Sequence, residues 1–419
     1  MKSSYADIVD ISSPVPAGNG SMDAGRTGDP TDTGDTLAAK NAGKTTIARV
    51  IEPEIRASIG KGKTIVIYGA RQVGKTTLLR TIFGAERTNS KILWLSGDDV
   101  RDREMLSTAS VEALRPLVER REVVIIDEAQ RIGDIGLKLK ILHDNFGGQT
   151  QFVATGSSSF DLANKINEPM TGRKRTFWLP APSALELKDT FGYLTEAENL
   201  DNRLIYGSYP AVVTDLGDAR TTITELSNDN LYKDVLNLGD IIKTDKLRLI
   251  LKALALQIGS QVSMTEIAGL VGIDRKTVEK YISLLEQSFI IFRLPSFGRN
   301  LRNELKFSQK IYFYDTGIRN AIINDFRGVD SRPDAGAIFE NYIIAELKKL
   351  HPTDNVYFWR TTDQQEVDFI IERDGGVYAY EVKLTKKAKL PNSFVEAYRP
   401  TKSVIVSRDN YLDVLTNGE

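Results

Sequence analysis

Eight consecutive residues have the types and the spacing that hold a phosphate chain in proteins. They fit the pattern G-x-x-x-x-G-K-[ST] and stand between an apolar run, 64–68, and a helical stretch that begins at Thr77. The glycines let backbone N–H groups surround phosphate oxygens, the lysine supplies a point charge, and the last hydroxyl can ligate magnesium. The segment therefore predicts a site for ATP and Mg2+. With the residue that follows, the predicted site consists of Gly69, Ala70, Arg71, Gln72, Val73, Gly74, Lys75, Thr76 and Thr77.

Two carboxylates follow a second apolar run. Asp127 and Glu128 come directly after four β-branched residues, which places them at the mouth of a buried strand. We predict that Asp127 holds magnesium through water and that Glu128, acting with the phosphate-loop lysine, orients or deprotonates the water that attacks the phosphate. A third apolar run ends at Thr155, where this hydroxyl or that of Ser157 could contact the γ-phosphate. A polar helix cap is the alternative for these hydroxyls.

A separate group of charged residues lies near the end of the sequence. Glu381 and Lys383 form an E-x-K step on a predicted strand, and Asp368 precedes this step on a partner strand across a hairpin turn, 374–376. With Glu340 on a neighbouring helix, three carboxylates and one lysine can converge. Three hard oxygen ligands suit magnesium or manganese, and Lys383 can hold or activate water for attack on a phosphodiester. Ordinary exposed strand charges are the alternative.

The composition limits the chemistry to groups of these kinds. The 419 residues contain no cysteine and two histidines, which excludes disulfides, thiolate metal sites and cysteine nucleophiles. Hydrophobic residues make up 41% and charged residues 26%, as in ordinary globular proteins. The formal net charge of −1 gives no overall attraction to nucleic acid, so any such binding must come from local patches. We expect a cytoplasmic protein without a membrane span or a secretory signal.

The elements that must position these groups define an α/β fold. Short apolar runs alternate with amphipathic stretches after residue 63, which is typical of a parallel sheet covered on both faces. We predict a P-loop ATPase domain over 45–225, a helical winged-helix region over 226–335 and an α/β restriction-endonuclease-like domain over 336–419. Residues 1–44 are rich in Gly, Ser, Thr, Asp and Pro and are predicted to be a disordered tail. Gly20-Ser21-Met22 resembles a cloning junction, so residues 1–21 need not all be native.

The middle region contains a helix-turn-helix pattern. Residues 265–278 predict a helix, a glycine-containing turn and a second helix that Asp274 caps. Arg275, Lys276 and Lys280 lie on the exposed start and face of this second helix. Residues 240–310 contain twelve Lys and Arg against seven Asp and Glu, so the region is basic in a chain that is otherwise acidic. The pattern favours phosphate contacts with DNA, and a structural role as a lid is the alternative.

These motifs together resemble the AAA-type P-loop ATPases, and more narrowly the prokaryotic group that carries a DUF4143 C-terminal region. The resemblance covers about residues 50 to 410. It implies that Arg173, in the Gly172-Arg173 step, acts on the γ-phosphate within its own chain or in a neighbouring subunit of a homo-oligomer; a solvated basic turn is the alternative. The C-terminal residues Asp368, Glu381 and Lys383 resemble the PD-(D/E)XK nuclease superfamily.

The sequence thus leads to two hypotheses of function. The first is an ATP-hydrolysing P-loop ATPase coupled to DNA binding, with metal-dependent DNA cleavage by the C-terminal domain as its final part. The second is an ATP-dependent switch that binds protein partners and carries an inactive nuclease-like scaffold. Salt-dependent DNA binding distinguishes them, because phosphate contacts release counterions and protein contacts need not.

Overall fold

The computed structural model describes most of the chain beyond residue 44. The described ranges are 45–84, 90–157, 166, 169–229, 244–298, 309–384 and 388–417. The predicted disordered tail, 1–44, lies outside them. Within these ranges, no helix combines the length and the apolar character needed to cross a membrane.

A five-stranded parallel sheet forms the first region. Its strands are ordered β2-β3-β4-β1-β5, and every pair is parallel, which confirms the predicted fold class. The edge strand β5 was not predicted, because it carries charged and exposed residues instead of an apolar run. The bounds are β1 Thr64–Tyr68, β2 Ile92–Ser96, β3 Val123–Asp127, β4 Gln151–Gly156 and β5 Lys174–Trp178.

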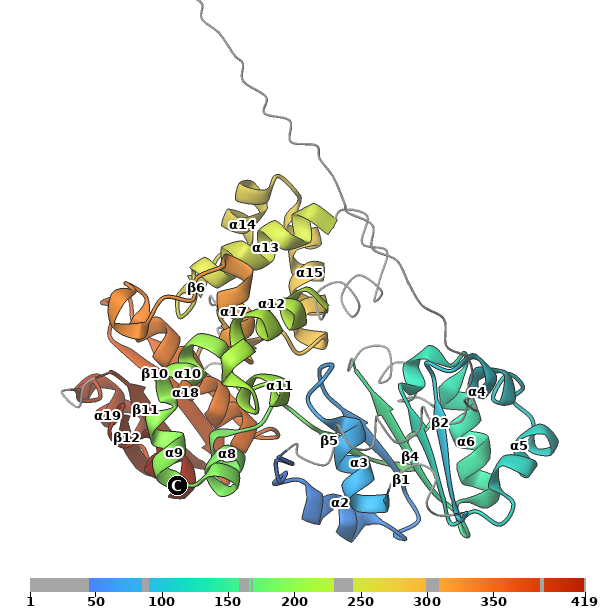
Figure 1. The fold of residues 1–419 in the computed structure, drawn as a ribbon. Helices are drawn as coiled ribbons and strands as arrows, with labels where there is room; N and C mark the ends of the chain where they lie inside the picture. The colour runs from blue at the N-terminus through green and yellow to red at the C-terminus, as the bar shows by residue number, and fades with distance from the viewer. Residues whose placement is uncertain are drawn as a thin grey trace, which may run out of the picture. The chain divides into compact units, whose positions relative to one another are not determined.

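Helices cover both faces of this sheet (Figure 1). Alternate residues of β1 point to opposite faces, so Ile65 and Ile67 join one core while Val66 and Tyr68 join the other. The first core contains residues of α2 and α3, and the second contains residues of α5 and α6. The helix bounds are α2 Glu52–Ser58, α3 Lys75–Phe83, α4 Val100–Met105, α5 Val111–Val118 and α6 Ile135–Phe146.

A group of short helices follows β5, and the first three of them pack on the C-terminal part of the chain. Ala184 and Leu204 share a hydrophobic core with residues 338–415. Glu196 and Arg203 form a fully buried ion pair between two of these helices. Residues of the last two short helices belong to the core that also contains one face of the parallel sheet. The predicted limit of the ATPase domain at residue 225 stays a prediction. The bounds are α8 Ala184–Phe191, α9 Tyr193–Glu198, α10 Leu200–Tyr206, α11 Pro210–Val213 and α12 Ala219–Asp229.

The middle region has the element order of a winged helix. Three helices alternate with a small sheet of order β6-β8-β7. Gly272 ends the first helix of the predicted motif in the left-handed conformation, and Asp274 caps the second by accepting from the Thr277 N–H at 2.9 Å. The bounds are α13 Thr244–Leu256, β6 Gln261–Val262, α14 Met264–Val271, α15 Arg275–Gln287, β7 Ile291–Leu294, β8 Gln309–Phe313 and, following them, α17 Thr316–Ile323.

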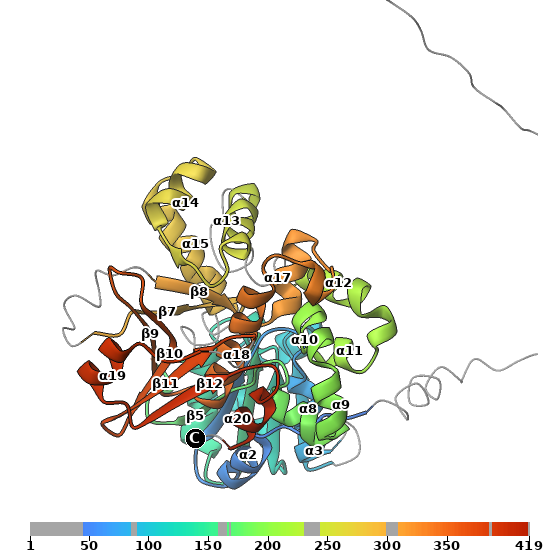
Figure 2. The same ribbon diagram turned by 90° about the vertical axis from the view of Figure 1, so that its left-hand side faces the viewer.

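The C-terminal region is a four-stranded mixed sheet with helices on both faces (Figure 2). The strand order is β12-β11-β10-β9, and only β11 and β12 are parallel. The predicted hairpin turn is present, with Asp374 and Gly375 both at positive φ. Helices α18 and α20 share one core with the sheet, and α19 packs on the other face. The bounds are α18 Ala335–Leu350, β9 Asn355–Arg360, β10 Glu366–Arg373, β11 Gly376–Val382, α19 Asn392–Tyr398, β12 Lys402–Val406 and α20 Tyr411–Asn417.

Candidate nucleotide site and C-terminal carboxylate cluster

The predicted phosphate loop connects β1 to α3. Gly74 lies at the N-terminus of α3 with φ of 100°, a conformation that favours glycine. Lys75 is 4% exposed, and its ammonium donates to the carbonyls of Gly69 and Ala70, both at 2.9 Å. A Cβ atom on Gly69 would lie 2.1 Å from the carbonyl oxygen of Leu179, which follows β5. The loop is thus packed closely against the neighbouring strand, and its ammonium lies at the loop itself.

Side chains from α3, β3 and β4 meet beside the loop. The Thr76 hydroxyl donates to Asp127 Oδ2 at 2.7 Å, and the Thr155 hydroxyl contacts Asp127 Oδ1. Thr155 also accepts from the Glu128 N–H at 3.2 Å. Hydroxyl and carboxylate oxygens are the hard ligands that magnesium prefers, and these two lie close together. Thr76 and Asp127 therefore fit a magnesium ion. The Thr155 hydroxyl thus lies against the Asp127 carboxylate. A contact of Thr155 or Ser157 with the γ-phosphate stays a prediction.

Glu128 is held by a residue that the sequence analysis did not identify. Its backbone has φ of 48°, in the left-handed region that is uncommon for non-glycine residues. The Gln130 amide donates to Glu128 Oε2 at 2.5 Å and to the Ser157 hydroxyl at 3.1 Å. Gln130 therefore bridges the ends of β3 and β4 and fixes the direction of the Glu128 carboxylate. Its position two residues after Glu128 was the only signal in the sequence.

Arg49 is a second residue that was missed. It is 7% exposed, and its guanidinium donates to the carbonyl of Val73 at 2.8 Å and to that of Pro180 at 2.6 Å. The same guanidinium forms an ion pair with Glu186 of α8 at 3.1 Å. This arrangement, here called the Arg49 clamp, joins the phosphate loop to the segment that leads from β5 into α8. No local motif marks Arg49, since its partners lie far away in the sequence.

Arg173 lies at the amino-terminal ends of the strands, opposite the end that carries the phosphate loop. It precedes β5, and the Thr64 N–H at the start of β1 donates to its carbonyl at 2.9 Å. The phosphate loop follows the far end of β1, about 13 Å away at the usual rise of a strand. The Arg173 side chain pairs with Asp144 at 2.6 Å, and this hydrogen bond raises its pKa. Action of Arg173 on the phosphate of its own chain is inconsistent with this placement, and action in a neighbouring subunit stays a prediction.

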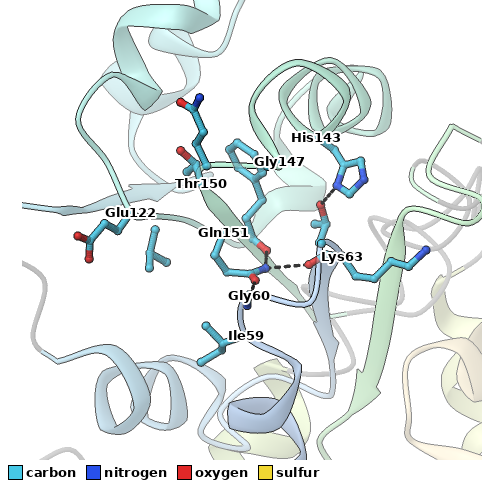
Figure 3. Close-up of a pocket in the computed structure, with 14 residues that line it drawn as sticks. Ile59, Gly60, Lys63, Glu122, His143, Gly147, Thr150 and Gln151 are labelled. Carbon is cyan, nitrogen blue, oxygen red and sulfur yellow. Dashed lines mark hydrogen bonds between the residues drawn. The ribbon is translucent and has the colours of Figure 1, made fainter.

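A cavity of about 330 Å3 also lies at the amino-terminal ends of the strands (Figure 3). Its lining includes Lys63, His143 and Gln151, near the starts of the central strands. The Gln151 amide already donates to the carbonyl of Lys63 at 2.8 Å and accepts from the Gly60 N–H at 2.9 Å. His143 contacts the Thr64 hydroxyl at 3.1 Å. Because β1 separates this cavity from the phosphate loop, the cavity is distinct from the nucleotide site.

Three of the four predicted C-terminal residues meet directly. The Asp368 carboxylate accepts from the Val382 N–H at 2.8 Å and from Lys383 Nζ at 3.0 Å. Lys383 Nζ also lies 2.8 Å from Glu381 Oε1. Asp368 and Glu381 are buried, and burial, followed by the charge of Asp368, raises the pKa of Glu381 to about 7. Burial alone would lower the pKa of Lys383, but Asp368 and Glu381 outweigh it and raise that pKa.

Glu340, the fourth predicted residue, is held by a different lysine. It lies within α18 and not at its start, and its carboxylate is 3.2 Å from Lys310 Nζ and 2.7 Å from the Tyr312 hydroxyl. Lys310, which the sequence analysis missed, also contacts Glu366. In the described part of the chain, no group of three or more Asp, Glu or His side chains is arranged to hold a metal ion. Lys310 pairs with Glu340, and Lys383 pairs with Asp368 and Glu381. That Glu340, Asp368 and Glu381 hold a magnesium or manganese ion stays a prediction.

The parallel sheet, the phosphate loop and the carboxylate at the end of β3 define a P-loop ATPase domain of the AAA type. Residues 61–187 match the family model described as "AAA domain", and residues 335–417 match "Domain of unknown function (DUF4143)". Both matches confirm the resemblance drawn from the motifs. Residues 197–328 match a further model, "Domain of unknown function (DUF8612)", which spans the winged helix and the short helices before it.

Similar whole chains come from several bacteria. Uncharacterized proteins of Mycobacterium tuberculosis and Mycobacterium bovis are each 25% identical over 347 residues, covering 82% of this chain and 75% of theirs. A Haemophilus influenzae protein is 23% identical and covers 84% and 88%. The Pif1 helicase of Candida albicans has a TM-score of 0.26 and 18% identity, covering 43% of this chain and 48% of its own. That score is too low to support an argument about this protein.

Proposed function

We propose that this protein hydrolyses ATP with Mg2+ at the phosphate loop and couples the nucleotide cycle to DNA binding by its winged helix. The observation that supports hydrolysis best is the set of contacts among Thr76, Asp127 and Thr155, with Glu128 held beside them. These groups come from three neighbouring elements and lie at one edge of the sheet. They support a magnesium site and a base beside the phosphate-binding loop.

Each residue has a distinct role in this proposal. The loop N–H groups and Lys75 bind the phosphates, while Thr76 and Asp127 hold Mg2+. Bound Mg2+ would neutralise charge on the β- and γ-phosphate oxygens. Glu128 accepts a proton from the attacking water or orients it, and Gln130 keeps the Glu128 carboxylate pointing toward the site.

The test is ATP binding and hydrolysis by two variants. Lys75→Ala should lose both nucleotide binding and hydrolysis. Glu128→Gln keeps the size and hydrogen bonds of the side chain, so it should bind ATP normally while hydrolysis falls by about 100-fold or more. Lys63→Ala, at the opposite edge of the sheet, is the control and should behave like the wild type. Normal turnover by Glu128→Gln would refute the assigned role.

DNA binding is proposed from the surface of α15. Arg275, Lys276 and Lys280 are exposed at its start and along one face, as the recognition helix of a winged helix requires. Arg275 forms an exposed ion pair with Glu279 at 2.9 Å, a kind of contact that costs little to exchange for a phosphate. The alternative, a switch that binds protein partners, predicts no dependence of DNA affinity on these three charges.

Neutralising the three cations of α15 together separates these alternatives. The triple alanine variant should bind DNA more weakly, and its plot of log affinity against log salt should be shallower by about two to three units. ATP hydrolysis without DNA should not change. Unchanged DNA affinity would favour the protein-partner switch. A matched control removes the same charge from exposed cations of the ATPase domain, Lys61, Lys91 and Arg101.

Cleavage of DNA is the part of the hypothesis that the geometry supports least, because Lys310 is paired with the predicted metal ligand Glu340. Incubation of single- and double-stranded DNA with Mg2+ or Mn2+, with and without ATP, tests it. Cleavage that disappears in Asp368→Ala would establish a metal-dependent nuclease, and its response to Lys75→Ala would show whether ATP controls it. We expect ATP hydrolysis without cleavage.

A further inference from the structure

Lys310 connects the winged helix to the C-terminal cluster. It lies on β8, and its side chain is 2% exposed. Its ammonium contacts Glu340 on α18 and Glu366 on β10, and it lies 5.9 Å from the ring centre of Tyr312 and 5.6 Å from that of Phe358. Two carboxylates and two aromatic rings therefore surround one buried cation.

The charges of the cluster are divided between two lysines. Lys310 pairs with Glu340 and Glu366, and Lys383 pairs with Asp368 and Glu381. Each ammonium thus lies between two carboxylates, where it does what a divalent ion would do in a metal site: it offsets the repulsion between them. The predicted ligand Glu340 is therefore already paired with Lys310, and its carboxylate also accepts a hydrogen bond from the Tyr312 hydroxyl.

The two lysines differ in how easily their ammonium groups can move away from the carboxylates. The Lys383 side chain is 44% exposed, so its ammonium can move into solvent without movement of a strand. Lys310 is enclosed, and its strand pairs with β6 and β7, so its ammonium cannot withdraw unless β8 moves. A divalent ion that entered next to Glu340 would meet the fixed positive charge of Lys310 at close range, and the two would repel.

We propose that Lys310 is an internal cation that takes the place of a divalent metal in the C-terminal cluster, so that the folded chain binds neither Mg2+ nor Mn2+ there. The proposal concerns a different site from ATP hydrolysis and does not depend on it. It also identifies a role for the winged-helix sheet, because β8 supplies the cation that the carboxylates of another domain need.

Manganese uptake by the full chain without nucleotide tests this proposal. All proteins carry Asp127→Asn, which removes a predicted ligand of the nucleotide site, and Mn2+ binding is followed by electron paramagnetic resonance and by thermal unfolding. The parent should bind no Mn2+ at micromolar concentrations. Lys310→Met frees Glu340 and Glu366, so it should unfold earlier, bind one Mn2+ and recover roughly 5 °C or more in Tm when Mn2+ saturates the site.

Lys349→Met is the matched control. The side chain of Lys349 is 3% exposed, and it pairs with Glu346 on the same helix as Glu340. Its loss should destabilise the protein without creating Mn2+ binding. Equal Mn2+ responses of the two methionine variants would overturn the proposal.

Two further outcomes bear on the inference. A parent protein that binds one Mn2+, and loses it in Asp368→Asn, would show that the cluster is a metal site after all and would overturn the proposal. If Lys310→Met fails to fold, the titration of the parent decides alone, since binding refutes the proposal and its absence supports it. ATP hydrolysis by the wild type, measured separately, is unaffected by either result.

Discussion

Replacing Arg49 by alanine should release the phosphate loop from the segment that leads into α8. Arg49 is 7% exposed and contacts the Val73 carbonyl, the Pro180 carbonyl and the Glu186 carboxylate at 2.6 to 3.1 Å. Loss of the guanidinium leaves one buried charge without its partner and two buried carbonyls without these donors. Breaking a buried ion pair from one side costs about 3 to 5 kcal/mol.

The cost of Arg49→Ala should lie near the lower end of the range of about 3 to 5 kcal/mol. Glu186 still accepts hydrogen bonds from the N–H groups of Val50 and Ser183, both at 2.8 Å, which partly solvate its charge. We therefore expect a loss of about 3 kcal/mol in the free energy of unfolding of the ATPase domain. If half of this loss acts on the loop conformation that binds phosphate, ATP affinity falls about tenfold.

The assay is urea unfolding of the full chain, followed in parallel by titration with a fluorescent ATP analogue. Arg56→Ala is the control, because the Arg56 side chain is 45% exposed and its ion pair with Glu52 should contribute less than about 1 kcal/mol. Glu186→Gln keeps the shape of the clamp but removes its charge and should show an intermediate loss. The reasoning fails if Arg49→Ala is no less stable than Arg56→Ala and binds the analogue normally.

Further predictions concern other parts of the molecule. Gly69→Ala should abolish ATP binding, because its Cβ would lie 2.1 Å from the Leu179 carbonyl oxygen, whereas Gly133→Ala, with open space around it, should bind ATP normally in the same titration. Burial raises the pKa of Glu381 to about 7, so the folded state holds this proton more tightly than the unfolded state. Stability should therefore fall as pH rises from about 4.5 to 7, and chemical unfolding of Glu381→Gln should lack this component; an identical pH slope would contradict it. If Arg173 acts in a neighbouring subunit, ATPase activity per chain should rise with protein concentration in the wild type and stay constant in Arg173→Ala. Total wild-type activity that is strictly proportional to protein concentration through the range of assembly would exclude this role.

The features that the sequence predicted correctly are local in the chain. The phosphate loop and the helix-turn-helix each depend on residues within about fifteen positions, and their physical requirements appear as a pattern of residue types. Lys310 and Arg49 have no such pattern, because their partners are brought to them by the packing of distant elements. The family resemblance implied that Arg173 acts on the γ-phosphate, and the sequence does not reveal at which end of a strand this residue lies. Strand β5 itself was missed because an edge strand with one charged face has no continuous apolar run.

The ion pair between Lys310 and Glu340 crosses the border between two family models, which lies between residues 328 and 335. This border separates a cation from its counterion. A chain that received a module whose β8 strand lacks this lysine would leave Glu340 and Glu366 without the cation between them. The two modules should therefore be inherited as a pair, and an exchange of either one should persist only with a compensating change in the other.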